Sequence, residues 1–271
     1  METLFRELTP AQESLFLTLY LRGLDRGSPD PILGDTVSAE IADKIDYDFT
    51  RQKVQYSLVL DLALRTKKLD DLIRAFVAKH PNAVVLDLGC GLDPRVLRCD
   101  LPSSTDWYDV DFPVVVGIRK RFLPHASHTI GADLTTHGWL DDIPAKRPTM
   151  IVADGLMAFL SGHAYQAMTR ALTAHFSTGE FAFNAYTPLV MRLGNYSGTF
   201  KALHARTAGE GINDPHEPEN WGARLVLIEE LLLVREPDVA KFPQPLRAFT
   251  RLCAHSTRIS RHGNRVIRYR F

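Results

Sequence analysis

The chain has 271 residues, 45% apolar and 24% charged, which is enough to bury a full core in one large domain or in a domain with a cap. Its 32 basic and 32 acidic residues give a formal net charge of zero, so no overall field favours nucleic acid or a membrane as a partner. Three scattered cysteines exclude a disulfide framework and fit a reducing compartment. The N-terminus lacks the pattern of a signal peptide and no apolar run is long enough to span a bilayer, so we expect a cytoplasmic protein.

The N-terminal part of the chain is predicted to be helical. The expected helices cover residues 10–24, 38–49 and 54–80, where apolar residues recur at helical spacing. Pro81 ends the last of them, because proline cannot continue a helix. We therefore expect residues 1–80 to form a helical cap and residues 81–271 to form the main domain.

Short apolar runs alternate with helical patterns in the rest of the chain. The expected strands are 83–88, 106–110, 128–131, 150–153, 180–186, 224–234 and 265–271, and the expected helices between them are 92–98, 112–122, 139–142, 163–176 and 243–255. This alternation is typical of βαβ units with helices on both faces of a parallel sheet. We expect an α/β fold, a doubly wound Rossmann-like sheet of seven strands with an antiparallel C-terminal strand and an irregular insert, 187–222, before strand six.

The first expected strand leads directly into a glycine turn, Gly89-Cys90-Gly91. Open α/β sheets bind ligands outside the carboxyl ends of their strands. A dinucleotide site needs a further glycine three residues after the second one, but Pro94 stands there. Asp93 beside it also disfavours a phosphate. The turn therefore argues against a nicotinamide-dependent oxidoreductase.

Acidic residues accompany the first three expected strands. Asp87 lies at the end of the first, Asp111 stands 20 residues past Gly91 at the end of the second, and Asp133 follows the third. An acid after the second strand binds ribose hydroxyls in nucleoside-binding sheets, and an acid on the first suits an ammonium or sulfonium group. The alternative role for each acid is to cap the next helix. Together they predict a nucleoside joined to a zwitterion, which is S-adenosylmethionine.

Four segments together resemble a known family. They are RTKKLDD before the first strand, the glycine turn, DVDFP after the second strand and ADGLMAFL after the fourth. They resemble the leucine carboxyl methyltransferase superfamily and, within it, the tetracenomycin-type polyketide O-methyltransferases, over most of the chain from Ser38 to Phe271. The resemblance implies a class I S-adenosylmethionine-dependent O-methyltransferase that acts on a small, polyketide-like or aromatic metabolite.

The same resemblance implies roles for individual residues. Arg65 would pair with the methionine carboxylate, Asp111 would hold the ribose, and Asp133 would line the adenine together with Leu134. Asp154 falls where the family usually has Glu and would lie near the amino group or the sulfonium, although its side chain is one methylene shorter. The expected cofactor-binding residues are Arg65, Asp87, Gly89, Gly91, Asp111, Asp133, Leu134 and Asp154.

The methyl acceptor is expected over the carboxyl ends of strands four and five, beneath the lid-like insert or the helical N-terminus. Transfer from a sulfonium requires alignment and exclusion of water, and it requires a base only where the acceptor is a protonated hydroxyl. The sequence contains no recognisable catalytic dyad and no metal motif. The candidates for acceptor contact are Asn184, Tyr186, Tyr196 and Trp221, and those for catalysis are Tyr186 and His204; ordinary packing of the insert is the alternative role of each.

Two other functions remain open from the sequence. One is carboxyl methylation of a protein or peptide C-terminus, as in the leucine carboxyl branch. The other is a methyltransferase-like binding protein without activity, because Asp154 departs from the family pattern. The fuller match to the small-molecule branch ranks both of them lower. The sequence names neither the acceptor nor the oligomeric state.

Overall fold

The computed structural model describes residues 8–49, 54–123, 127–136, 138–194 and 207–271. The strands are β1 (Val84–Leu88), β2 (Asp106–Asp111), β3 (His128–Gly131), β4 (Thr149–Ala153), β5 (Gly179–Ala185), β6 (Val226–Leu232) and β7 (Arg265–Arg270). The α-helices are α2 (Pro10–Asp25), α3 (Thr36–Lys44), α4 (Tyr56–Lys79), α5 (Arg95–Cys99), α6 (Pro113–Phe122), α7 (Gly162–His175), α8 (Pro188–Gly194), α10 (Leu246–Ala254) and α11 (Thr257–Ser260). None of these helices has the length and apolar character needed to cross a membrane.

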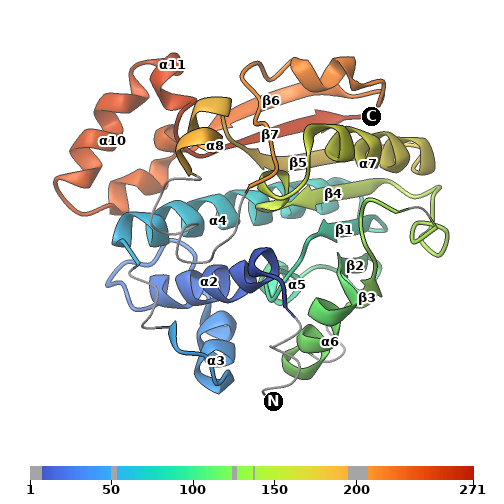
Figure 1. Ribbon diagram of the computed structural model, residues 1–271, viewed down its shortest axis with the longest axis horizontal. Helices are drawn as coiled ribbons and strands as arrows, with labels where there is room; N and C mark the ends of the chain where they lie inside the picture. Colours follow the sequence, from blue (N-terminus) through green and yellow to red (C-terminus); the bar gives the residue numbers. More distant parts are fainter. Residues whose placement is uncertain (1–7, 50–53, 124–126, 137, 195–206) are drawn as a thin grey trace.

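The seven strands form one sheet in the order β3-β2-β1-β4-β5-β7-β6 (Figure 1). Neighbouring strands are parallel from β3 to β5, whereas β7 is antiparallel to both β5 and β6. The chain moves outward from β1 to β3 and then returns to place β4 on the other side of β1. The doubly wound sheet with an antiparallel C-terminal strand, predicted from the sequence, is therefore confirmed.

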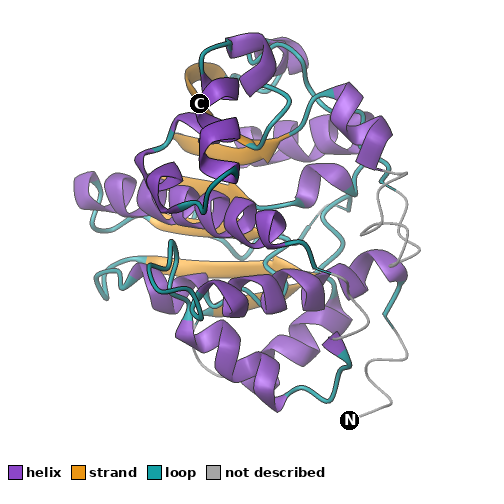
Figure 2. Cartoon of the chain, turned by 90° about the vertical axis from the view of Figure 1, so that its left-hand side faces the viewer, coloured by secondary structure: helices purple, strands orange, loops and turns teal. Residues whose placement is uncertain are grey.

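Both faces of the sheet are covered by helices (Figure 2). All five residues of β1 are buried, as expected for an apolar strand at the centre of a parallel sheet. Val84, Leu86 and Leu88 belong to the core that includes α7, while Val85 faces the opposite way into the core that includes α4. The carboxyl ends of the central strands therefore open between two packed layers.

The helix α2 begins with a capping box. The Thr9 hydroxyl accepts the backbone N–H of Gln12, and the Gln12 side chain accepts the backbone N–H of Thr9. Phe16 of α2 shares a core with α3, and Leu21 packs with residues of α4. Because α4 also packs on the sheet, the N-terminal helices are continuous with the core of the α/β unit.

Several expected boundaries differ from the structure. The helix expected over 38–49 is α3 and ends at Lys44, and the helix expected over 92–98 begins only at Arg95. The helix expected over 139–142 is wrong, because this segment forms hydrogen-bonded turns, with the N–H of Asp141 donating to Gly138 and that of Ile143 to Leu140. Four residues are too few for helical periodicity to be distinguished from a turn.

Candidate active site

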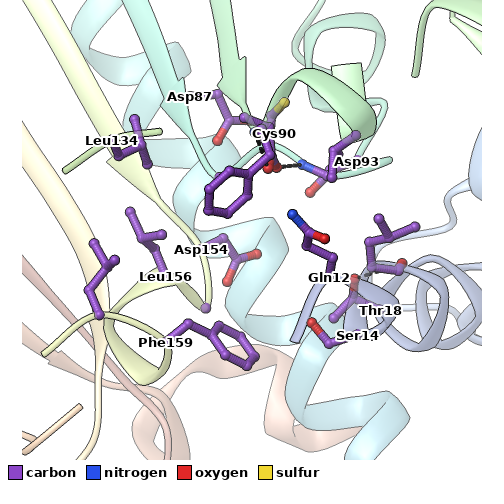
Figure 3. A pocket seen from close by; sticks show the side chains of 18 of the residues that line it. Gln12, Ser14, Thr18, Asp87, Cys90, Asp93, Leu134, Asp154, Leu156 and Phe159 are labelled. Carbon is purple, nitrogen blue, oxygen red and sulfur yellow. Dashed lines mark hydrogen bonds between the residues drawn. The ribbon is translucent and has the colours of Figure 1, made fainter. Parts of the chain in front are cut away.

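The carboxyl ends of β1, β2 and β4 meet at a pocket of about 350 Å³ (Figure 3). Leu88 on β1 lies opposite Val110 on β2 and Ala153 on β4, so Asp111 and Asp154 each follow the residue paired with it. This is also where the strand order reverses, which is the usual ligand site of such sheets. The eight residues expected to bind the cofactor all line this pocket: Arg65, Asp87, Gly89, Gly91, Asp111, Asp133, Leu134 and Asp154.

The glycine turn has a backbone conformation that suits glycine. Gly89 and Gly91 have φ angles of +66° and +51°, in the region that other L-residues rarely adopt. The carboxylate of Asp111 accepts the backbone N–H of Gly91 at 2.8 Å and that of Phe112 at 2.7 Å. Burial raises the pKa of Asp111, although these two hydrogen bonds oppose the shift. The turn and this acid are thus fixed to each other before any ligand binds.

Arg95 lines the pocket and is almost fully buried, with 1% of its side chain exposed. Its guanidinium group forms ion pairs with four carboxylates, those of Asp70 (3.0 Å), Asp87 (3.2 Å), Asp93 (3.1 Å) and Asp154 (3.1 Å). These acids come from α4, β1, the glycine turn and the end of β4. Arg95 therefore connects the elements that carry the predicted site.

Asp87 has an unusual protonation equilibrium. Burial raises its pKa to about 8, with Arg95 opposing the shift and the buried carboxylates of Asp109 and Asp93 adding to it. A cationic group bound beside Asp87 would favour the ionised form. This position therefore suits an ammonium or sulfonium group.

Arg65 of α4 connects Asp154, which is expected to bind the cofactor, with Tyr186, which is expected to contact the methyl acceptor. Its Nε is 2.6 Å from Asp154, and its Nη1 donates to the hydroxyl of Tyr186 at 2.7 Å. The Asp154 carboxylate thus meets two guanidinium groups, those of Arg65 and Arg95. The shorter Asp154 side chain is held by these two arginines at the edge of the pocket.

Residues of the N-terminal helix α2 line the pocket, although none of them was predicted as a site residue from the sequence. Thr9, Gln12, Ser14, Leu15, Thr18 and Arg22 of this segment line the pocket. Arg22 is buried, and the ion pair that it forms within the described part of the chain is a long one, 3.4 Å to Asp93. Burial lowers the pKa of Arg22, with Asp93 opposing the shift. The spacing of Gln12, Leu15, Thr18 and Arg22 along one helical face was the available signal.

Among the described residues, those predicted to contact the methyl acceptor do not line the pocket as the predicted cofactor-binding residues do. Asn184 is buried and accepts the backbone N–H of Gly155 at 2.6 Å, so it shapes the turn that carries Asp154. Trp221 is buried in the core edge-to-face with Tyr165 and does not line the pocket. Tyr186 is not among the residues that line the pocket, but its hydroxyl accepts a hydrogen bond from Arg65, which does line it. Tyr196 and His204 lie outside the described residues.

The lining chemistry fits S-adenosylmethionine. Five carboxylates and three guanidinium groups face the pocket, so acidic groups are in excess. The cofactor carries two cationic groups, an ammonium and a sulfonium, and one carboxylate. The under-partnered Arg22 suits that carboxylate, and the positive-φ turn at Gly89 and Gly91 lets a ligand approach the backbone closely. The sheet order and a pocket of this composition define a class I methyltransferase.

Comparison with known proteins gives the family. Residues 24–173 match the model of the leucine carboxyl methyltransferase family. The tetracenomycin polyketide synthesis O-methyltransferase TcmP of Streptomyces glaucescens is 36% identical over 97% of this chain and 98% of that protein. The S-adenosyl-L-methionine-dependent methyltransferase dpfgK of Gibberella zeae is 30% identical over 70% of each chain. This chain therefore belongs to the leucine carboxyl methyltransferase family and is an S-adenosylmethionine-dependent methyltransferase.

Proposed function

We propose that this enzyme methylates an oxygen atom, hydroxyl or carboxyl, of a small polyketide-like or aromatic metabolite. The observation that carries the proposal is the 36% identity to TcmP over nearly the full length of both chains. The pocket supports it with an apolar wall formed after β4 by Leu156, Phe159 and Leu160. Such a wall suits the ring system of an aromatic acceptor.

We assign the two ends of the pocket to the two halves of the cofactor. The nucleoside end comprises Gly91, Asp111, Asp133 and Leu134, where the two oxygens of Asp111 accept the protons of both ribose hydroxyls. The methionine end comprises Arg22, Arg65, Asp87, Gly89 and Asp154. Arg22 and Arg65 hold the carboxylate, because a guanidinium group pairs with a carboxylate through two parallel hydrogen bonds. Asp87 holds the ammonium group.

The protein's part in the reaction is mainly to align the acceptor. S-adenosylmethionine, when bound, would supply a methyl group activated by the sulfonium, and its sulfur would keep the electron pair of the bond that is broken. The hydroxyl of Tyr186 accepts a hydrogen bond from Arg65 and has no acceptor for its own proton among the residues that the structure describes, so it can donate a hydrogen bond to an acceptor oxygen. Tyr186 thereby positions the acceptor oxygen beside the methionine end, while the apolar wall excludes water.

A methyl-transfer assay tests the proposal. Formation of S-adenosylhomocysteine is measured with a panel of aromatic hydroxy acids and phenols, and in parallel with a peptide that ends in leucine. Turnover of members of the aromatic panel with no turnover of the peptide is the expected result. Turnover of the peptide alone would instead establish carboxyl methylation of a protein or peptide C-terminus. Tight cofactor binding without any turnover on either acceptor set would favour the inactive binding protein.

The pH profile of single-turnover transfer identifies the acceptor group. A phenol with a pKa near 10 is protonated at neutral pH, so its methylation increases with pH, while a carboxylate with a pKa near 4 gives a flat profile from about pH 6 to 8. We expect a rising profile and a loss of rate in Tyr186→Phe and His204→Ala. A flat profile with full activity in both variants would identify a carboxylate as the acceptor.

A further inference from the structure

The capping box of α2 also orients a side chain in the pocket. The carboxamide oxygen of Gln12 accepts the backbone N–H of Thr9 at 2.9 Å, and this bond fixes the direction of the amide. Gln12 lines the pocket, and its nitrogen has no hydrogen-bond acceptor within the described part of the chain. Figure 3 shows this nitrogen pointing into the pocket, toward the turn that holds Cys90 and Asp93.

The choice of Gln rather than Glu at this position has a chemical meaning. Both residues complete a capping box equally well, because each offers an oxygen to the N–H at the start of the helix. Glu would direct a second anionic oxygen at a pocket that already holds five carboxylates. Gln directs an NH₂ group, which only donates. Since no group in the described part of the chain accepts a hydrogen bond from this NH₂ group, it can donate to an acceptor atom of a bound molecule.

The position of Gln12 identifies the part of the ligand it meets. Leu15, one turn further along α2, covers Gly91, since a Cβ built on Gly91 would lie 3.5 Å from the Leu15 Cβ. The N–H of Gly91 is bound by Asp111. Gln12 therefore lies at the nucleoside end. Because Asp111 accepts the hydroxyl protons of the ribose, the hydroxyl oxygens keep lone pairs that require a donor.

We propose that Gln12 donates a hydrogen bond from its amide to a ribose hydroxyl oxygen of the cofactor, complementing Asp111. The inference rests on the cofactor arrangement proposed above and adds a specificity residue from α2. Asp111 then accepts the protons of the ribose hydroxyls and Gln12 donates to one of their oxygens. Through Gln12, the helix α2 contacts the nucleoside directly.

Calorimetric titration with S-adenosylhomocysteine and with adenosine tests this role in Gln12→Glu and Gln12→Ala. Gln12→Glu keeps the capping box, so we expect an unchanged melting temperature and both ligands bound about tenfold more weakly. Gln12→Ala should weaken both by about threefold to tenfold. Binding of both ligands by Gln12→Glu as tightly as by the unmodified protein would overturn the proposal.

Ribose analogues identify the contact itself. With whichever of 2′-deoxyadenosine and 3′-deoxyadenosine lacks the hydroxyl that Gln12 meets, Gln12→Ala should cause no further loss. Equal additional losses with both analogues would overturn the ribose contact. Asp111→Ala distinguishes a failure of the Gln12 proposal from a failure of the proposed nucleoside end. If Asp111→Ala weakens adenosine while Gln12→Glu does not, only the Gln12 proposal fails. If neither variant alters binding, the proposed nucleoside end fails with it.

Discussion

The two ends of the pocket, which we assign to the nucleoside and to the methionine part of the cofactor, are built by different means. At the nucleoside end, Asp111 is held by backbone N–H groups of Gly91 and Phe112, so the arrangement depends on the β1 turn and the neighbouring β2. At the methionine end, arginines from α2, α4 and α5 meet acids from four separate elements. The first end depends on local backbone geometry, whereas the second depends on tertiary packing and balanced charge.

The largest effect is expected from breaking the charge network at the methionine end. Arg95→Met leaves the carboxylates around it without their common cation, and removing one partner of a buried ion pair costs about 3–5 kcal/mol. The free energy of unfolding in urea measures this loss. Arg74→Met is the matched control, because Arg74 pairs with Asp71 at the surface and should cost about 0–1 kcal/mol. Equal losses in the two variants would contradict a special role for Arg95.

The next effect distinguishes the two ends by ligand. Arg65→Ala should weaken S-adenosylhomocysteine about tenfold to hundredfold, because a charged hydrogen bond contributes about 1.5–3 kcal/mol, while adenosine binds nearly unchanged. Titration calorimetry with both ligands measures the difference. Lys67→Ala, a partly exposed change on the same helix, should leave both affinities unaltered. Parallel losses for both ligands in Arg65→Ala would indicate a folding defect instead of a carboxylate site.

The reverse pattern is expected at the nucleoside end. Asp111→Ala should weaken S-adenosylhomocysteine and adenosine alike, by about tenfold, because each lost hydrogen bond contributes about 0.5–1.5 kcal/mol. The exposed Asp141→Ala serves as the control. Undiminished binding in a folded Asp111→Ala protein would remove Asp111 from the site.

The smallest effect concerns the protonation of Asp87. Its folded pKa of about 8 lies above the unfolded value of about 3.9, so the folded state binds the proton more tightly and stability falls as pH rises between these values. Asp87→Asn should flatten this decline by at most about 1.4 kcal/mol between pH 6 and pH 7. Urea unfolding at both pH values gives the slope. Identical slopes in the two proteins would show that Asp87 does not titrate in this range.

The sequence predicted what depends on local pattern. The strands were located to within about two residues, because apolar runs end at glycine and proline, and Asp111 followed from its spacing to Gly91. The contribution of α2 was not predicted, because Arg22 meets Asp93 only after α2 packs on α4. The burial of Trp221 was not predicted for a related reason, since an aromatic residue in an irregular segment gives no periodic signal of burial.

The place of β7 in the sheet determines the order in which the sheet can be completed. β6 is an edge strand whose one neighbour is β7, yet β7 begins only at Arg265, after the helices α10 and α11. During synthesis on the ribosome, β6 therefore emerges before the strand that will join it to β5 has been made. Until then its backbone groups and apolar side chains are available to other strands, which is the period in which a chain is prone to aggregate.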